Sequence, residues 1–159
     1  MAEIQLSGVS MVYPNGTQAL KQVDLTVPDH EFIVLLGPSG CGKSTLLRLI
    51  ARLYRPTGGA ITQYIDEKFK QKPKGSKAWY KKVGVVYQNP DYQLFMPTVR
   101  QEISFGAKSE EYAAEIAELF GVKHLWERHP QSLSEGQKRR VSIAAVAACG
   151  SEVLLLDEP

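Results

Sequence analysis

One continuous segment, residues 37–45, limits what this chain can fold into more than any other. It reads Gly-Pro-Ser-Gly-Cys-Gly-Lys-Ser-Thr, a complete G-x-x-x-x-G-K-[ST] motif, between an apolar run at 32–36 and a run with helical character at 46–50. This order predicts a buried strand that turns sharply into a helix, with backbone N–H groups and the positive end of the helix dipole aimed at one point. The three glycines let the backbone wrap a phosphate chain without clashes from Cβ atoms. The segment therefore predicts a binding site for a nucleoside triphosphate.

Two side chains of this segment have predicted roles toward the nucleotide. Lys43 supplies a mobile cation for the β- and γ-phosphates, and Ser44 supplies a hydroxyl for Mg²⁺. A glycine-rich turn without a ligand is the alternative, and the flanking strand and helix make it the weaker interpretation. The predicted nucleotide-binding residues of the segment are Gly37, Ser39, Gly40, Cys41, Gly42, Lys43, Ser44 and Thr45.

The rest of the chain alternates strand and helix patterns. Hydrophobic residues make up 43% and charged residues 23%, which is ordinary for a soluble globular domain. A Pro-Asn-Gly turn at 14–16 separates the first two alternating segments and predicts an antiparallel hairpin. The later alternation of strands and helices predicts an α/β fold with a mainly parallel core sheet. We expect strands over 4–13, 19–27, 31–36, 60–65, 83–87 and 153–156, and helices over 43–53, 98–105, 110–120 and 136–148.

A second motif lies near the end of the sequence. The apolar run at 153–156 is followed directly by Asp157 and Glu158. At the carboxyl end of a buried strand, Asp157 is suited to the shell of a Mg²⁺ ion, and Glu158 is suited to polarise a water for attack on a γ-phosphate. Alone, the pattern equally describes a strand that meets solvent, and the phosphate-binding segment upstream favours the catalytic interpretation.

A third motif decides the class of protein. Residues 133–137 read Leu-Ser-Glu-Gly-Gln and stand immediately before a predicted helix. Here the chain resembles the ATP-binding cassette family, whose hallmark Leu-Ser-Gly-Gly-Gln lies just upstream of an Asp-Glu strand. The resemblance covers essentially the whole chain. It implies a phosphate-loop NTPase with a mainly parallel core sheet, an N-terminal antiparallel β subdomain and an inserted helical subdomain at about 89–148, all within a single domain over 1–159.

The resemblance also implies roles for residues outside the first motif. Tyr13 resembles the aromatic platform that stacks on adenine, with a rim tyrosine on a strand as the alternative. Gln88 resembles the catalytic-site glutamine that ligates Mg²⁺ together with Ser44 and Asp157. Ser134, Gly136 and Gln137 resemble the signature residues that contact ATP bound to a second ATPase subunit. This pattern implies a head-to-tail dimer, of identical or different subunits, with two ATP molecules.

Residues 88–95 read Gln-Asn-Pro-Asp-Tyr-Gln-Leu-Phe, which is similar to a run typical of energy-coupling factor ATPases. Those ATPases energise uptake of vitamins and transition metals, and the similarity implies a position on the cytoplasmic face of the membrane. Tyr92, Leu94, Phe95 and Met96 are expected to be exposed in a loop over 88–99 that contacts a transmembrane scaffold subunit. The alternative is that these apolar residues pack internally.

The sequence departs from the family pattern in three places. The span from Gly106 to Leu133 is somewhat shorter than the family usually shows, which implies a trimmed helical subdomain. Glu135 stands where the family has glycine, and we expect its side chain to point away from ATP, because Ser134 and Gly136 are retained. The sequence also stops at Pro159, directly after the predicted catalytic Glu158, so we expect a C-terminally incomplete ATPase domain. His30, His124 and His129 match no family histidine.

Two other functions remain open on the sequence. A soluble cassette ATPase that acts on nucleic acid or ribosomes would use the lysine-rich stretch 68–82, although a solvated loop is the simpler interpretation of that stretch. A truncated module that binds nucleotide without turnover is the other. The leading hypothesis is an ATP- and Mg²⁺-dependent ATPase of an uptake transporter, with no nucleic-acid partner.

Overall fold

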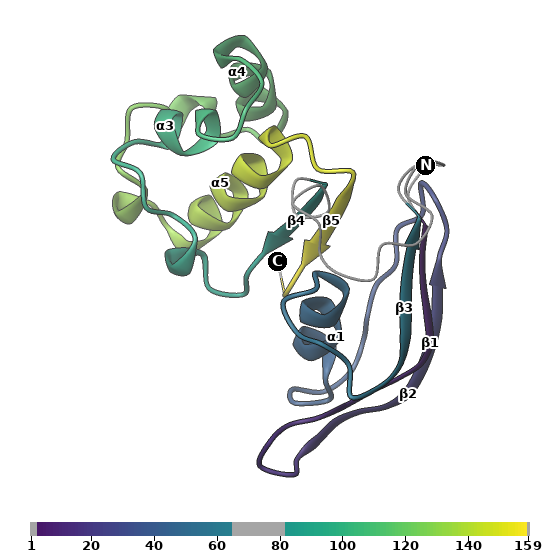
Figure 1. Cartoon of the computed structure of the whole chain (residues 1–159). Helices are drawn as coiled ribbons and strands as arrows, with labels where there is room; N and C mark the ends of the chain where they lie inside the picture. The colour runs from purple at the N-terminus through teal and green to yellow at the C-terminus, as the bar shows by residue number, and fades with distance from the viewer. Residues whose placement is uncertain (1–2, 65–81, 159) are drawn as a thin grey trace. The chain divides into compact units, whose positions relative to one another are not determined.

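The computed structural model describes residues 3–64 and 82–158, which belong to two compact units that divide at about residue 76. The first unit contains three strands and one α-helix, and the second contains two strands and a group of helices (Figure 1). None of the helices in the described ranges has the length and apolar character that crossing a bilayer requires. The lysine-rich stretch 68–82 lies outside the described residues except for Lys82, which pairs with Glu152.

The first unit is built on an antiparallel sheet. Its strands are β1 (Glu3–Val12), β2 (Gln18–Val27) and β3 (Gly58–Tyr64), in the order β2-β1-β3. The hairpin between β1 and β2 is confirmed: the Tyr13 N–H donates to the Thr17 carbonyl at 2.9 Å. The alternation of β1 buries one face of the sheet, with shifts of register at bulges, through Ile4, Leu6, Val9 and Met11.

Helix α1 (Lys43–Ile50) follows the phosphate-binding segment and buries Leu46 and Leu49. It is shorter than the expected 43–53, because Arg52 adopts a left-handed φ of 60° that a helix does not allow. The carbonyl at its C-terminal end is satisfied by β3, since the Gln63 amide donates to the Ile50 carbonyl at 2.7 Å.

The expected buried strand over 31–36 is wrong in this structure. These residues form neither strand nor helix, and the side chains of Phe32 and Leu36 are 81% and 89% exposed. An apolar run becomes a strand only where a neighbouring strand takes up its backbone N–H and C=O groups. In the described part of the chain no strand is paired with 31–36.

The second unit contains a parallel pair of strands, β4 (Val83–Val86) and β5 (Val153–Leu156). The expected strands at these positions and their parallel direction are confirmed, with Val86 opposite Leu156. The pairing continues one step further, because the Asp157 N–H donates to the Val86 carbonyl at 3.0 Å. The segments that follow the two strands therefore leave the sheet at the same edge.

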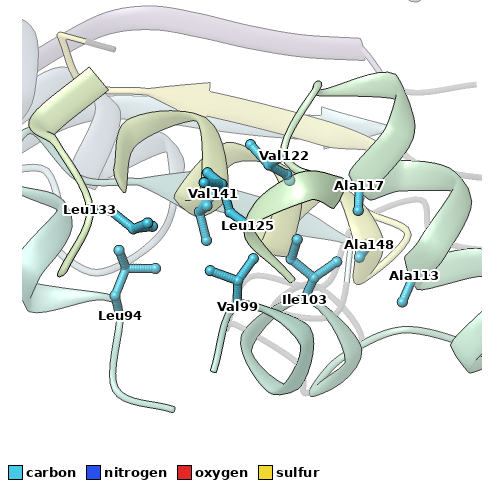
Figure 2. Packing of buried hydrophobic residues seen from close by; sticks show 11 residues of the cluster. Leu94, Val99, Ile103, Ala113, Ala117, Val122, Leu125, Leu133, Val141 and Ala148 are labelled. Atoms are coloured by element: carbon cyan, nitrogen blue, oxygen red, sulfur yellow. The ribbon is translucent and has the colours of Figure 1, made fainter. Parts of the chain in front are cut away.

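The helices of the second unit surround one apolar cluster (Figure 2). Val99, Ile103, Val122 and Val141 are fully buried in it. The α-helices agree with the expected positions within one or two residues, and three of them begin at hydroxyl caps, namely Thr98, Ser109 and Ser134. The helical elements are η2 (Pro90–Tyr92), α3 (Val99–Ser104), α4 (Glu110–Leu119), η3 (Lys123–Leu125), η4 (Pro130–Ser132) and α5 (Glu135–Ala148).

Candidate functional site

The phosphate-binding segment wraps around the ammonium group of Lys43. This group donates hydrogen bonds to the carbonyl oxygens of Gly37 at 2.6 Å and Pro38 at 3.1 Å, and it lies 3.7 Å from the Cys41 sulfur. The cation is therefore held inside the loop by backbone acceptors. A bound phosphate would offer negatively charged oxygens in place of these neutral carbonyls, so the ammonium group would gain an ion pair in addition to its hydrogen bonds.

Close approach requires a glycine at position 42 of this loop, and position 37 also has a near neighbour. Gly42 has a φ of 96°, and a Cβ atom built there would lie 2.5 Å from the Ala19 carbonyl oxygen and 2.7 Å from the Leu20 side chain of β2. A Cβ at Gly37 would lie 2.6 Å from the Cys41 sulfur. Gly42 is also the residue that caps α1, and it provides no side chain to the first backbone N–H groups of the helix. The absence of a side-chain cap at these N–H groups favours an anion at this helix end.

Tyr13 lies beside the beginning of α1. Its hydroxyl is 2.9 Å from the hydroxyl of the buried Thr45, and its ring meets the Tyr54 ring edge-on at a centroid distance of 6.3 Å. The side chain of Thr45, expected among the nucleotide-binding residues, thus has a partner in the protein itself. Stacking of Tyr13 on adenine stays a prediction.

In the second unit the parallel strands bring Gln88 and Glu158 together, although they are 70 positions apart. The Gln88 side-chain amide donates to the Glu158 carboxylate at 2.6 Å. Glu158 has a left-handed φ of 51°, and Arg139 of α5 donates to its backbone carbonyl at 2.5 Å. The carboxylate is exposed, while the neighbouring Asp157 is buried at the end of β5. The predicted metal ligand, Asp157, is therefore shielded from solvent, whereas the predicted catalytic base, Glu158, is open to it.

The chemistry of the donors fits a Mg²⁺ ion. Ser44 offers a hydroxyl, Asp157 a buried carboxylate and Gln88 an amide oxygen, and Mg²⁺ prefers such oxygen ligands together with phosphate oxygens and waters. The Gln88 amide nitrogen, not its oxygen, is the atom that donates to Glu158. Ser44 belongs to the first unit, and Gln88 and Asp157 belong to the second. Ligation of one ion by the three stays a prediction.

The signature residues form the exposed beginning of α5. Ser134 caps the helix in a capping box: the Gln137 N–H donates to the Ser134 hydroxyl at 3.4 Å, and the Ser134 N–H donates to the Gln137 side chain at 3.0 Å. Gly136 is exposed, and a Cβ there would meet nothing within 4 Å. The Glu135 carboxylate lies 3.5 Å from the Lys138 ammonium. The side chains of Ser134 and Gln137 thus fix the geometry of the segment that is predicted to face a second nucleotide.

The loop over 88–99 differs in part from its expected form. Tyr92 and Phe95 are 84% and 67% exposed, whereas Leu94 is 5% exposed and packs in the helical cluster of Figure 2. The expected exposure of Leu94 is therefore wrong. This side chain packs internally, as the alternative interpretation predicts. Met96 is half-buried.

Three residues of the second unit that order its loops were not found from the sequence. The buried Glu102 carboxylate accepts the N–H groups of Phe95 at 2.9 Å and Met96 at 2.7 Å, while Lys138 and Arg139 reach Asp91 and Glu158. The pattern Ser-x-x-Gln at 134–137 is a sequence signal for the capping box. The spacing of Glu135 and Lys138 is a signal for an ion pair along the helix. No local pattern indicates contacts between residues as distant as Arg139 and Glu158.

The phosphate loop and the ends of the parallel strands define the class of protein. A glycine-rich phosphate loop opens a helix, and two parallel strands end beside Gln88 and an Asp-Glu pair, which is the arrangement of a phosphate-loop NTPase. A family model described as ABC transporter matches residues 20–159. The chain therefore belongs to the ABC transporter family.

Individual relatives are ATP-binding components of transporters. A nickel import ATP-binding protein, LarO, of Lactiplantibacillus plantarum is 38% identical over 98% of this chain and 69% of its own length. An energy-coupling factor transporter ATP-binding protein, EcfA, of Methanosphaera stadtmanae is 41% identical over 92% of this chain and 55% of its own length. The structure of cbiO1 from Clostridium perfringens, part of the ABC transporter complex cbiONQ, matches with a TM-score of 0.82 and 32% identity over 98% of this chain and 65% of that protein. The chain thus spans about half to two thirds of these relatives.

Proposed function

We propose that this chain is part of an ATPase subunit that energises a membrane uptake transporter of the energy-coupling factor type, on the cytoplasmic face of the membrane. The relatives named as nickel import and energy-coupling factor proteins support the transport role. The observation that carries the ATPase role is the pairing of Gln88 with Glu158 at the ends of neighbouring parallel strands. A side-chain amide held at 2.6 Å fixes the orientation of the carboxylate that has to act on water.

The proposed roles divide between the two units. In the first, Lys43 exchanges its bonds to the loop carbonyls for bonds to phosphate, and Tyr13 stacks on adenine. In the second, Glu158 accepts a proton from the water that attacks the γ-phosphate. Gln88 holds this carboxylate through its amide nitrogen, and its amide oxygen would be available to a bound Mg²⁺. A bound Mg²⁺ would neutralise charge on the phosphates.

Two partners complete the proposal. The exposed beginning of α5, with Ser134 and Gly136, contacts ATP held by a second ATPase subunit. The loop over 88–99 contacts a transmembrane subunit through Tyr92 and Phe95, whose ring is supported edge-on by Phe105 at a centroid distance of 5.4 Å. Exposed aromatic side chains of this kind are favourable anchors at an interface.

The test is phosphate release from ATP by the full-length protein and its Gln88→Ala variant. We expect turnover by the wild type and a turnover about 10- to 100-fold lower in the variant. The ATP affinity of the variant should equal that of the wild type. An exposed glutamine of the same unit, Gln131, provides the matched control as Gln131→Ala. Binding without turnover in the wild type would support a nucleotide-binding module instead, and no binding at all would contradict the proposal.

A further inference from the structure

Lys138 is a buried cation that joins two segments distant in the sequence. Its side chain is 10% exposed, and its ammonium group lies 2.8 Å from the Asp91 carboxylate and 3.5 Å from that of Glu135. The hydrogen bond that the Lys138 ammonium group donates to the Asp91 carboxylate raises the pKa of Lys138 above its ordinary value. The residue therefore remains charged at neutral pH, and these two carboxylates balance its charge.

The Asp91 end of this bridge belongs to an ordered part of the 88–99 loop. The Asn89 side chain accepts the Asp91 N–H at 2.9 Å and so begins η2. The Gln93 side chain donates to the Val85 carbonyl at 3.0 Å and accepts the Tyr87 N–H at 3.3 Å. These bonds attach residues 89–93 to strand β4. A displacement of Asp91 should therefore move residues 89–93 together.

The other end of the bridge is the first turn of α5. Lys138 follows Gln137 directly, and its own N–H bonds to the Ser134 carbonyl at 2.8 Å. The next residue, Arg139, holds the backbone of Glu158. The Lys138 side chain is only 10% exposed, whereas that of Asp91 is 42% exposed. Removing Asp91 would therefore leave a largely buried ammonium group without its nearest counter-ion, which is unfavourable. The signature segment 134–137 and the loop 89–93 are thus held to one another by an interaction that resists separation.

We propose that Lys138 is a positioning residue that transmits nucleotide-dependent movement of the signature segment to the 88–99 loop. The inference rests on the proposed function, in which the first segment meets ATP and the second meets the membrane subunit. Lys138 itself contacts neither nucleotide nor partner in this account. Its contribution is to make two surfaces with different ligands move together.

The experiment is hydrogen exchange of the full-length protein with and without Mg²⁺ and a non-hydrolysable ATP analogue. In the wild type we expect the analogue to slow exchange at 37–45 and at 134–138, and to change it at 89–96. In Lys138→Met, which keeps the length of the side chain, we expect the change at 89–96 to fall at least about threefold while protection at 37–45 persists. Lys123→Met removes another lysine of the second unit, one that lies over the Trp126 ring, and should leave all three responses as they are.

Two further variants separate positioning from a general loss of structure. Lys138→Arg keeps the charge and should retain the response of the loop, whereas Asp91→Asn leaves Lys138 in place and should lose it. An unchanged response at 89–96 in both Lys138→Met and Asp91→Asn would overturn the inference. Failure of the proposed function has a different signature, because the wild type would then show no protection at 37–45, and the inference would fall with it.

Discussion

One apolar run precedes the predicted phosphate-binding residues and another precedes the predicted catalytic residues, and only one of the two runs forms a strand. The run at 153–156 is strand β5, paired in parallel with β4, and it delivers Asp157 and Glu158 to the edge where Gln88 also lies. The run at 31–36 precedes the phosphate loop and is not a strand, with Phe32 and Leu36 exposed. The difference shows that an apolar composition allows a segment to form a strand, but that the strand forms only where a neighbouring strand pairs with its backbone.

The same comparison separates the phosphate loop, the first part, from the Gln88–Glu158 pair, the second part. The phosphate loop keeps its form without a preceding strand, because Lys43 and the glycines organise it locally. The Gln88–Glu158 pair exists only because β4 and β5 lie side by side. Variants in the first part should therefore affect nucleotide binding, and variants in the second should affect turnover.

The largest expected effect is that of Glu158→Gln. Loss of the general base should lower the kcat for ATP hydrolysis by about 10²- to 10⁴-fold, while the Kd for ATP stays near the wild-type value. Steady-state phosphate release and equilibrium binding of ATP measure the two quantities. Glu118→Gln, on the exposed face of α4, is the control and should change neither. A loss of ATP affinity in Glu158→Gln as large as its loss of kcat would contradict the division between the two parts.

Lys43→Ala should give the reverse pattern. Removal of the cation that lies within the loop should weaken ATP binding by about 100-fold, or about 2.7 kcal/mol, because hydrogen bonds to charged groups are lost. Calorimetric titration with ATP measures the change. Lys21→Ala removes an exposed lysine from β2 of the same unit and should bind ATP as the wild type does. Retention of wild-type affinity in Lys43→Ala would remove the phosphate loop from the account.

Gly42→Ala tests the local organisation of the loop. The left-handed φ of 96° and the approach of the Ala19 carbonyl make this substitution unfavourable, by about 1–3 kcal/mol for the strained backbone alone. Denaturant unfolding measures the loss of stability. Gly136→Ala is the matched control, since a Cβ there meets nothing within 4 Å, and it should leave the free energy of unfolding unchanged or slightly higher. Equal stability of the two variants would show that the loop tolerates a side chain.

The smallest expected effect appears at alkaline pH. The pKa of Lys138 is raised in the folded protein, so its pairing with Asp91 contributes stability that is fully present below the ordinary lysine pKa of about 10.4 and is lost as the pH rises through the raised value. The wild type should therefore lose more stability than Lys138→Met over this window. Denaturation curves of both proteins from neutral pH upward give the difference. Parallel pH profiles would show that the ion pair is not linked to folding.

The sequence predicted those parts of the molecule that local patterns determine. The hairpin at Asn15-Gly16, the helix of the phosphate loop and the capped helices of the second unit follow from turn residues, hydroxyl caps and apolar spacing. The strand at 31–36 and the exposure of Leu94 were wrong, because both depend on which other segment supplies a partner or a core. The bridge of Lys138 to Asp91, across 47 positions, depends on the fold in the same way.

The identity of the nucleotide bound to the Glu158→Gln variant tests the central claim most directly. Wild type and variant would be incubated with radiolabelled ATP and Mg²⁺ and separated from free nucleotide, and the bound nucleotide would then be identified. We expect the wild type to yield mainly ADP and the variant to yield intact ATP at similar occupancy. Recovery of ADP from both proteins in equal amounts would show that hydrolysis does not depend on Glu158 and would contradict the account.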